Sequence, residues 1–143
     1  MNGFVGMPIL SHIEGNLYVG MSPCYWPTPP TMFRTIFNLY VWNDYPVVVG
    51  QTRYDIEMRD SENVADISVL RRYAVKINEA QEIGPVLVHC QMGINRSNLL
   101  AAFALILKGR TAKEAIQLLR DKRSPYVLMN RAFELFLLKL GDI

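Results

Sequence analysis

The sequence has 143 residues, half of which are hydrophobic, and carries a formal net charge of +2. A chain of this length forms one domain, and its apolar content suffices for a core without disulfides or a structural metal. The small charge argues against a nucleic-acid binder held by bulk electrostatics. The two cysteines, Cys24 and Cys90, are too few for a disulfide framework or a zinc site. We therefore expect residues 1–143 to form a single domain that needs no metal and no cofactor.

Nothing in the sequence predicts a membrane segment or an export signal. The first residues, MNGFVGMPILSHIEGN, lack the basic stretch followed by a long apolar run that marks a secretory signal peptide. No apolar run reaches the roughly 18 residues that a transmembrane helix needs. We therefore expect a soluble, monomeric protein of the cytoplasm, a reducing compartment in which Cys90 stays a thiol.

Four segments have the composition of β-strands. Residues 15–20 form a short apolar run that ends in glycine, and residues 35–42 are rich in β-branched and aromatic side chains, which indicates a buried strand. In residues 53–58 polar and apolar side chains alternate, as in a strand with one solvated face. Residues 86–90 (VLVHC) are too few and too apolar for anything but a buried strand. A proline-rich loop is expected between the first two strands.

The second half of the chain is predicted to be mainly helical. Between residues 65 and 81 apolar side chains recur at helical spacing, and residues 98–108 are apolar on nearly all sides, as in a central, buried helix. Thr111 and Glu114 have the spacing of a capping box at the start of a further helix. A last helix is expected at residues 130–140. Its predicted inward side chains are Phe133, Phe136, Leu137 and Leu140.

The predicted fold is α/β, a central mixed β-sheet flanked by helices, and its most informative part is the loop that joins residues 86–90 to the buried helix. The loop reads His89-Cys90-Gln91-Met92-Gly93-Ile94-Asn95-Arg96-Ser97. Its backbone N–H groups can point inward as an anion-binding nest, and the following helix adds the positive end of its dipole. Gly93 permits a cramped or left-handed backbone. The Arg96 guanidinium can bind two oxygens of one phosphate-like group.

Cys90 lies at the base of this predicted phosphate-binding loop. The thiol pKa of about 8.5 falls at a helix N-terminus or beside a cation, and Ser97 can donate a hydrogen bond to the sulfur. We therefore interpret Cys90 as a thiolate that attacks phosphorus while Arg96 and the backbone hold the phosphate. The alternative is an inert core thiol, with Arg96 in a surface salt bridge. The joint spacing of these residues and Gly93 favours the catalytic interpretation.

The motif His89-Cys90-x5-Arg96-Ser97 resembles the signature of cysteine-based protein tyrosine phosphatases, and the form HCxxGxxRS resembles their dual-specificity branch. Residues 15–20 are similar to the early strand of that branch. Residues 54–68 resemble its strand, acid loop and following helix, and residues 122–133 resemble its late Ser-Pro-Asn segment. The resemblance implies a phosphotyrosine-phosphatase-like fold, with the signature loop between a buried strand and a central helix, and a phosphocysteine intermediate.

A phosphatase of this kind needs an acid that protonates the leaving oxygen, and four aspartates precede the loop: Asp44, Asp55, Asp60 and Asp66. Asp55 lies on the solvated face of a predicted strand, and Asp66 is expected to cap a helix. Asp44 lies in VWNDYP, which is similar to the Trp-Pro-Asp loop of larger tyrosine phosphatases but lacks its middle proline. Asp60 directly follows a strand end, where loops carry function, and the resemblance places the acid there. We choose Asp60.

Three other residues have roles to weigh. His89 is expected to orient the cysteine and tune its charge, which is compatible with a buried histidine bonded to a backbone carbonyl. Asn130 resembles the asparagine that steadies the signature and acid loops of the family, and the alternative is an N-cap of the last helix. Cys24 is a candidate for a disulfide with an oxidised Cys90, although an unreactive Cys24 is the simpler interpretation.

We expect a protein phosphatase that hydrolyses phosphotyrosine and, with it, phosphoserine or phosphothreonine, so that the partner is a phosphoprotein or phosphopeptide. The variable loop positions Gln91, Met92, Ile94 and Asn95 include no lysine, which argues against an inositol lipid because relatives that act on such lipids tend to carry lysines there.

Two other functions remain open. Asn95-Arg96 makes the loop similar to the G-x-N-R-T segment of phosphatase-like RNA 5′-triphosphatases, so an RNA 5′ end is the alternative substrate. Four arginines are candidates for a basic rim near the acid loop, although a solvated strand edge and helix face would explain them equally: Arg53, Arg59, Arg71 and Arg72. The second alternative is a phosphate-binding module without catalysis, against which the presence of Cys90, Arg96 and Asp60 argues.

Overall fold

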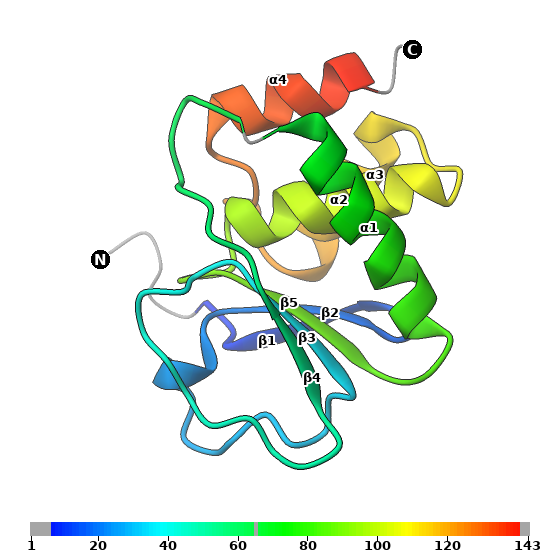
Figure 1. Ribbon diagram of the computed structural model, residues 1–143. Coiled ribbons are helices and arrows are strands. Elements are labelled where there is room, and N and C mark those ends of the chain that lie inside the picture. The colour runs from blue at the N-terminus through cyan, green and yellow to red at the C-terminus, as the bar shows by residue number, and fades with distance from the viewer. Residues whose placement is uncertain (1–6, 65, 141–143) are drawn as a thin grey trace.

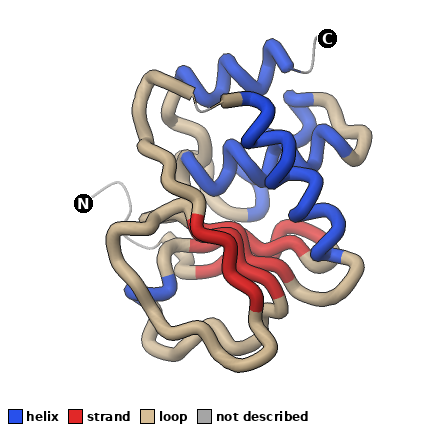
Figure 2. The backbone as a smooth tube through the Cα atoms, viewed as in Figure 1, coloured by secondary structure: helices blue, strands red, loops and turns tan. Residues whose placement is uncertain are grey.

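The computed structural model of the chain describes residues 7–64 and 66–140. Its strands form one sheet in the order β1-β2-β5-β3-β4 (Figures 1 and 2). The strands are β1 (Leu10–Glu14), β2 (Leu17–Gly20), β3 (Thr35–Asn38), β4 (Thr52–Asp55) and β5 (Val86–His89). The helices are α1 (Ile67–Gln81), α2 (Arg96–Leu107), α3 (Ala112–Lys122) and α4 (Arg131–Leu140), and Pro23–Tyr25 forms the 3-10 turn η2.

The sheet is mixed, as the sequence predicts. β1 and β2 pair antiparallel, whereas β2 with β5, β5 with β3, and β3 with β4 pair parallel. The four helices gather on one face of the sheet (Figure 1). On the other face a smaller apolar cluster of Phe33, Ile36, Tyr45 and Leu87 closes the sheet with residues from the loops before and after β3. The predicted α/β class is therefore confirmed.

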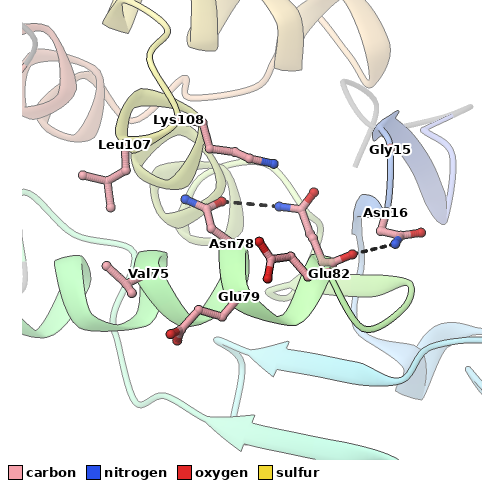
Figure 3. A pocket seen from close by; sticks show the side chains of 9 residues that line it. Gly15, Asn16, Val75, Asn78, Glu79, Glu82, Leu107 and Lys108 are labelled. Carbon is pink, nitrogen blue, oxygen red and sulfur yellow. Dashed lines mark hydrogen bonds between the residues drawn. The ribbon is translucent and has the colours of Figure 1, made fainter.

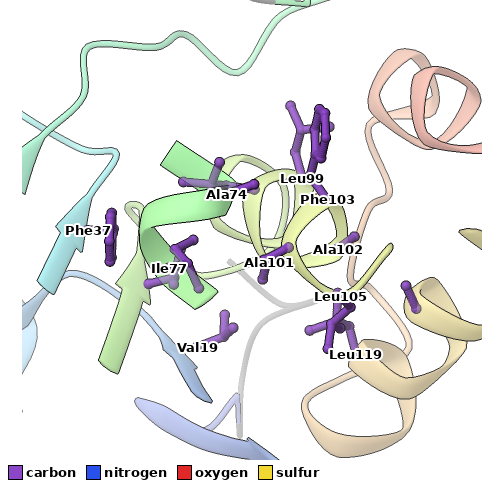
Figure 4. Close-up of a cluster of buried hydrophobic side chains, with 14 of the residues drawn as sticks. Val19, Phe37, Ala74, Ile77, Leu99, Ala101, Ala102, Phe103, Leu105 and Leu119 are labelled. Atoms are coloured by element: carbon purple, nitrogen blue, oxygen red, sulfur yellow. The ribbon is translucent and has the colours of Figure 1, made fainter. Parts of the chain in front are cut away.

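The main core lies between the sheet and the helices, with α2 at its centre. From Leu99 to Leu105 no residue of α2 is more than 1% exposed, as expected for a helix that is apolar on nearly all sides. Figure 4 shows side chains of β2, β3, α1 and α3 converging on this helix, among them Val19, Phe37, Ile77 and Leu119. Because α2 is packed on every side, its N-terminus is held rigidly against the sheet.

The predicted helix caps at Asp66 and Thr111, and most of the predicted inward side chains, are confirmed. The Asp66 carboxylate accepts the Ser68 N–H at 2.8 Å and caps α1, and Thr111 and Glu114 form the predicted capping box of α3. In α4, Phe133 and Leu137 are fully buried. Phe136 and Leu140 pack against the core while partly exposed. In the described part of the chain, no helix is long and apolar enough to cross a membrane.

Several predicted boundaries were wrong. Strand β1 was not predicted, and the strands expected at residues 35–42 and 53–58 end early, at Asn38 and Asp55. The Asn38 side chain explains both ends: its amide nitrogen donates to Asp55 at 2.9 Å, and its oxygen accepts the Tyr40 N–H at 2.9 Å, which turns the backbone out of the sheet. Helix α2 begins at Arg96, two residues earlier than predicted.

Candidate active site

The signature loop, residues 90–96, joins the end of β5 to the start of α2 (Figure 1). Cys90 is the first residue after the strand, and Arg96 and Ser97 open the helix. α2 has 12 residues, so its free N–H groups and the positive end of its dipole face the loop. The loop therefore has the position of an anion-binding site.

The carbonyl groups of the signature loop are bonded by donors outside it. The Gln91 carbonyl accepts the Ser22 N–H at 2.9 Å, and the Ile94 carbonyl accepts the Leu128 N–H at 2.8 Å. The carbonyls of Met92 and Gly93 accept hydrogen bonds from Arg123 at 2.9 and 2.7 Å. In a trans peptide the C=O and the following N–H point in opposite directions, so the N–H groups of residues 92–95 point away from these donors and are available to an anion.

Gly93 is required at its position for two reasons. Its φ of 73° lies in the left-handed region, which residues other than glycine rarely adopt. A Cβ atom would also lie 2.6 Å from the Gly20 carbonyl oxygen and 2.6 Å from a terminal guanidinium nitrogen of Arg123. Any side chain here would displace the donors that hold the loop.

The Cys90 thiol is only 3% exposed, and its sulfur lies 3.3 Å from the Ser97 hydroxyl oxygen. Burial alone would raise the pKa of this thiol, but the hydrogen bond from Ser97 and the charge of Arg96 outweigh it. The backbone N–H groups of Ser97 and Ile94 act in the same direction, so the pKa lies below the usual range of a cysteine. The surroundings of Cys90 therefore favour the thiolate form of its side chain.

Arg96 is 7% exposed and has unused hydrogen-bonding capacity. One terminal nitrogen donates to the Met58 carbonyl at 3.2 Å, whereas the buried Nε has no hydrogen-bond partner among the described residues. A buried guanidinium N–H without a partner is costly unless a ligand takes it up. The Arg96 Cζ lies 5.6 Å from the centre of the Tyr40 ring and 5.8 Å from that of Trp42, so two aromatic rings flank the guanidinium.

His89 is fully buried behind the loop, and burial lowers its pKa to about 4, so the ring is neutral at physiological pH. Its Nδ1 lies 3.1 Å from the Cys90 carbonyl oxygen, which can only accept, so Nδ1 carries the proton. Nε2 therefore accepts the Tyr45 hydroxyl at 2.6 Å. Sequence reasoning missed Tyr45, because no local pattern signals a contact across 44 residues.

Of the four candidate acids, the structure places Asp60 beside the signature loop. Its two carboxylate oxygens accept hydrogen bonds from the side-chain amides of Asn95 and Asn130, at 2.8 and 2.7 Å. The Asn95 oxygen accepts the Asn130 N–H at 2.9 Å, and the Asn130 oxygen accepts the Phe133 N–H at 3.3 Å. Asn130 thus makes the contacts of both alternatives: it caps α4, and it links Asp60 to Asn95 of the signature loop.

The other three aspartates have different partners. Asp44 and Asp55 both form ion pairs with Arg53 at 2.9 Å, and Asp66 caps α1. The proposed basic rim is wrong for Arg53, whose side chain is only 13% exposed and stacks on the Tyr45 ring. The basic residue beside the acid loop is Arg59, whose guanidinium lies 5.7 Å from the centre of the Trp42 ring.

A cavity of about 640 Å³ lies elsewhere, near the C-terminal end of α2 (Figure 3). Its lining includes Asn16, Asn78 and Lys108 but none of the residues of the signature loop. The side-chain amides there are already engaged: Asn16 donates to the Gln81 carbonyl and Gln81 donates to Asn78, as the dashed lines in Figure 3 mark. The chemistry-bearing residues therefore gather at the opposite end of α2.

Comparison with known proteins gives a consistent result. A family model described as dual specificity phosphatase, catalytic domain, matches residues 18–142, whereas no curated protein sequence matches. A mouse putative dual specificity phosphatase complexed with zinc tungstate is 19% identical, with a TM-score of 0.82 over 94% of this chain and 87% of that chain. Human DUSP28 is 18% identical, with a TM-score of 0.79 over 94% of each chain. OH1 from the Orf virus, a tyrosine phosphatase, is 24% identical, with a TM-score of 0.71 over 92% of this chain and 86% of that chain.

Proposed function

The chain belongs to the dual specificity phosphatase family, and from this premise we propose that it hydrolyses phosphotyrosine, and with it phosphoserine or phosphothreonine, in proteins through a phosphocysteine intermediate. The observation that carries the proposal is the signature loop itself. The buried Cys90 has a lowered pKa and begins a loop whose carbonyls are bonded by donors outside it. The Nε of Arg96, at the start of α2, has no partner among the described residues.

The first proposed step transfers the phosphoryl group to the enzyme. The Cys90 thiolate attacks phosphorus, the S–P bond forms, and the bond from phosphorus to the leaving oxygen breaks while Asp60 supplies that oxygen with a proton. The loop N–H groups and Arg96 bind the equatorial phosphoryl oxygens, whose charge they stabilise in the transition state. In the second step Asp60 takes a proton from water, the water oxygen attacks phosphorus, and orthophosphate and the thiolate are released.

Asp60 must release a hydrogen bond before it can act as an acid. Two side-chain amide N–H groups, from Asn95 and Asn130, donate to its two oxygens. A protonated Asp60 has only one good acceptor oxygen left for them. We infer that the amide of Asn95 or Asn130 turns away when the substrate binds, which leaves the proton free for the leaving group.

The surroundings of Arg96 support an aryl phosphate as the preferred substrate. Tyr40 and Trp42 flank the guanidinium, and Trp42 is 46% exposed, so part of its ring faces solvent. A phosphate bound to Arg96 would bring the ring of phosphotyrosine next to these side chains, where aromatic contacts are worth about 0.5–1.5 kcal/mol beyond burial. The methylene of phosphoserine offers no such contact.

The RNA alternative has lost its main support. Asn95 was the residue that favoured it, and both ends of its side-chain amide bond within the chain, to the Asp60 carboxylate and to the Asn130 N–H. These contacts explain an asparagine directly before Arg96 without an RNA ligand. A protein substrate therefore stays the preferred proposal.

A panel of substrates tests the function. Phosphate release should be fastest from phosphotyrosine peptides, slower from phosphoserine peptides, and slowest from inositol phospholipids and triphosphorylated RNA, with the Cys90→Ser protein as the inactive control. Trp42→Ala should slow phosphotyrosine turnover several-fold more than phosphoserine turnover. Faster release of the γ-phosphate from RNA would support the RNA function instead. Phosphopeptide binding with no turnover of any phosphoester would support a binding module.

The general acid is tested by leaving groups of different basicity. Asp60→Asn should lower kcat about 10²-fold for phenyl phosphate, whose leaving oxygen needs a proton, but only a few-fold for p-nitrophenyl phosphate, whose leaving group departs as the anion. Asp44→Asn is the matched control, because that side chain is exposed and pairs with Arg53, and it should leave both rates near wild type. Equal slowing of both substrates by Asp60→Asn would exclude Asp60 as the acid.

A further inference from the structure

Arg123 is a buried cation to which the proposed mechanism gives no role. It lies at the C-terminal end of α3 and is only 6% exposed. None of the ion pairs that the described residues form includes it. A buried charge without a partner of opposite sign is expensive. Its hydrogen bonds must therefore offset the cost of burying the charge.

The guanidinium of Arg123 is bonded mainly to the signature loop. Its Nε donates to the Gly93 carbonyl at 2.7 Å, and a terminal nitrogen donates to the Met92 carbonyl at 2.9 Å. The other terminal nitrogen donates to the Ser11 hydroxyl at 3.0 Å, which anchors the group to β1. The planar fork thus fixes two successive peptide groups of the loop relative to the edge strand of the sheet.

These two peptide groups carry N–H groups that the site uses. The Met92 carbonyl shares a peptide unit with the Gly93 N–H, and the Gly93 carbonyl shares one with the Ile94 N–H. Arg123 bonds both oxygens, and the Asn98 side-chain amide also donates to the Gly93 carbonyl at 2.9 Å. Both N–H groups therefore point to the opposite side. The Ile94 N–H is one of the donors that lower the pKa of the Cys90 thiol, so the contact from Arg123 to Gly93 is transmitted to the sulfur through one rigid peptide unit.

The charge of Arg123 acts together with this geometry. Burial lowers the pKa of the guanidinium to about 10, and the charge of Cys90 opposes that fall. The group is therefore still protonated at neutral pH, and the anion it senses is the thiolate. Ser97 and Arg96 contribute more to the lowered pKa of the Cys90 thiol, so Arg123 acts on the sulfur mainly through the loop.

We propose that Arg123 is a positioning residue of the phosphatase site: it holds the Met92 and Gly93 carbonyls outward, so that the loop presents its N–H groups to the Cys90 sulfur and to the phosphate. The catalytic part of this inference rests on the proposed function. It predicts that Arg123 controls both the ionisation of Cys90 and the affinity of the loop for a tetrahedral oxyanion.

The test measures both properties in the full chain on a Cys24→Ser background, where Cys90 is the one remaining cysteine. The pH dependence of iodoacetamide alkylation reports the pKa of the Cys90 thiol, and calorimetry with inorganic tungstate reports oxyanion affinity. In Arg123→Met the alkylation midpoint should rise by about one pH unit, because the Ile94 N–H is no longer held toward the thiolate. The tungstate Kd should rise about tenfold. Arg123→Lys should weaken tungstate binding by a smaller factor, because one ammonium cannot bond both carbonyls with the geometry of a fork.

Arg110→Met is the matched control, since Arg110 forms a two-pronged ion pair with Glu14 away from the loop. It should leave the midpoint and the tungstate Kd unchanged. A folded Arg123→Met protein with the midpoint and Kd of its parent would overturn the proposal, even if its Tm had fallen. Should that variant not fold, Arg123→Lys decides: unchanged tungstate affinity would overturn the proposal.

Neither measurement requires turnover. If the chain released phosphate from no substrate, the proposed function would fail, while a shift of the alkylation midpoint in Arg123→Met would still support the role of Arg123 in the loop. If the chain turned over phosphotyrosine and the midpoint did not move, the function would stand and the inference would fail.

Discussion

Replacement of Cys90 by serine is expected to lower kcat for an aryl phosphate by at least about 10⁴-fold, because the serine hydroxyl is not ionised near neutral pH and is a far weaker nucleophile than a thiolate. The native Cys90 thiol is 3% exposed and bonded to Ser97, and its lowered pKa favours the thiolate form that the proposed mechanism requires. Steady-state hydrolysis of p-nitrophenyl phosphate measures the effect.

Oxyanion binding should survive the same substitution. The loop N–H groups and Arg96 remain, and the loss of a negative sulfur beside the anion removes a repulsion. We expect the tungstate Kd of Cys90→Ser to stay within about threefold of wild type or to fall below it. Acid-quenched wild-type protein should carry one phosphoryl group on Cys90, which mass spectrometry of the digested protein detects.

The second cysteine provides the control for this prediction. Cys24→Ser makes the same chemical change at the other free thiol, which lies in η2 and is partly exposed. Its turnover should match wild type within about twofold, as for most substitutions away from special features. Turnover retained in Cys90→Ser, or lost to an equal degree in Cys24→Ser, would contradict the phosphocysteine mechanism.

The sequence predicts the signature loop well because its parts are neighbours along the chain. Cys90, Gly93, Arg96 and Ser97 lie within eight residues, between an apolar run that can only be a buried strand and a helix that is apolar on nearly all sides. Once those two elements form, chain geometry alone brings the thiol, the guanidinium and the backbone N–H groups together. Two boundaries differ: the strand ends at His89, so Cys90 belongs to the loop, and α2 begins at Arg96, so the arginine belongs to the first helical turn.

The residues that support the loop could not be found in this way. Tyr45 reaches His89 across 44 residues, and Arg123 reaches Gly93 across 30. Such contacts depend on how the loop after β3 and the end of α3 pack against the sheet, which no periodicity encodes. For Arg123 the residue type itself predicts the wrong location, because an arginine is expected at the surface unless it is paired.

The case of Asp60 is intermediate. Its place just after the strand end, together with the family resemblance, was sufficient to choose it over the other aspartates. The sequence predicts only one of the two contacts that hold Asp60. The resemblance indicates Asn130, whereas Asn95 is interpreted there as support for an RNA substrate. The structure shows instead that the Asn95 amide joins Asp60 to Asn130. A polar residue in a variable position of a loop is thus informative only when its partner is known.

Arg96 carries the second large expected effect. Arg96→Lys should lower kcat/KM for p-nitrophenyl phosphate by about 10³-fold and weaken tungstate binding at least tenfold, because lysine offers a point charge where the site needs two parallel donors. One nitrogen of the guanidinium already bonds the Met58 carbonyl, and the buried Nε is unsatisfied among the described residues. An ammonium group has three donors, but it cannot direct them at the carbonyl and at two phosphoryl oxygens with the parallel geometry of the guanidinium.

The same substitution at Arg110 separates this effect from a general loss of stability. Arg110 pairs with both oxygens of Glu14, so Arg110→Lys also removes a fork, but at a site that does not touch the signature loop. It should keep kcat/KM within about twofold of wild type. Added guanidinium ion should restore part of the activity of Arg96→Ala, since it can reoccupy the space beside Tyr40 and Trp42 where the two rings flank the charge. Wild-type kcat/KM in Arg96→Lys would show that the phosphate does not bind this guanidinium, because a lysine could not replace two of its donors without loss.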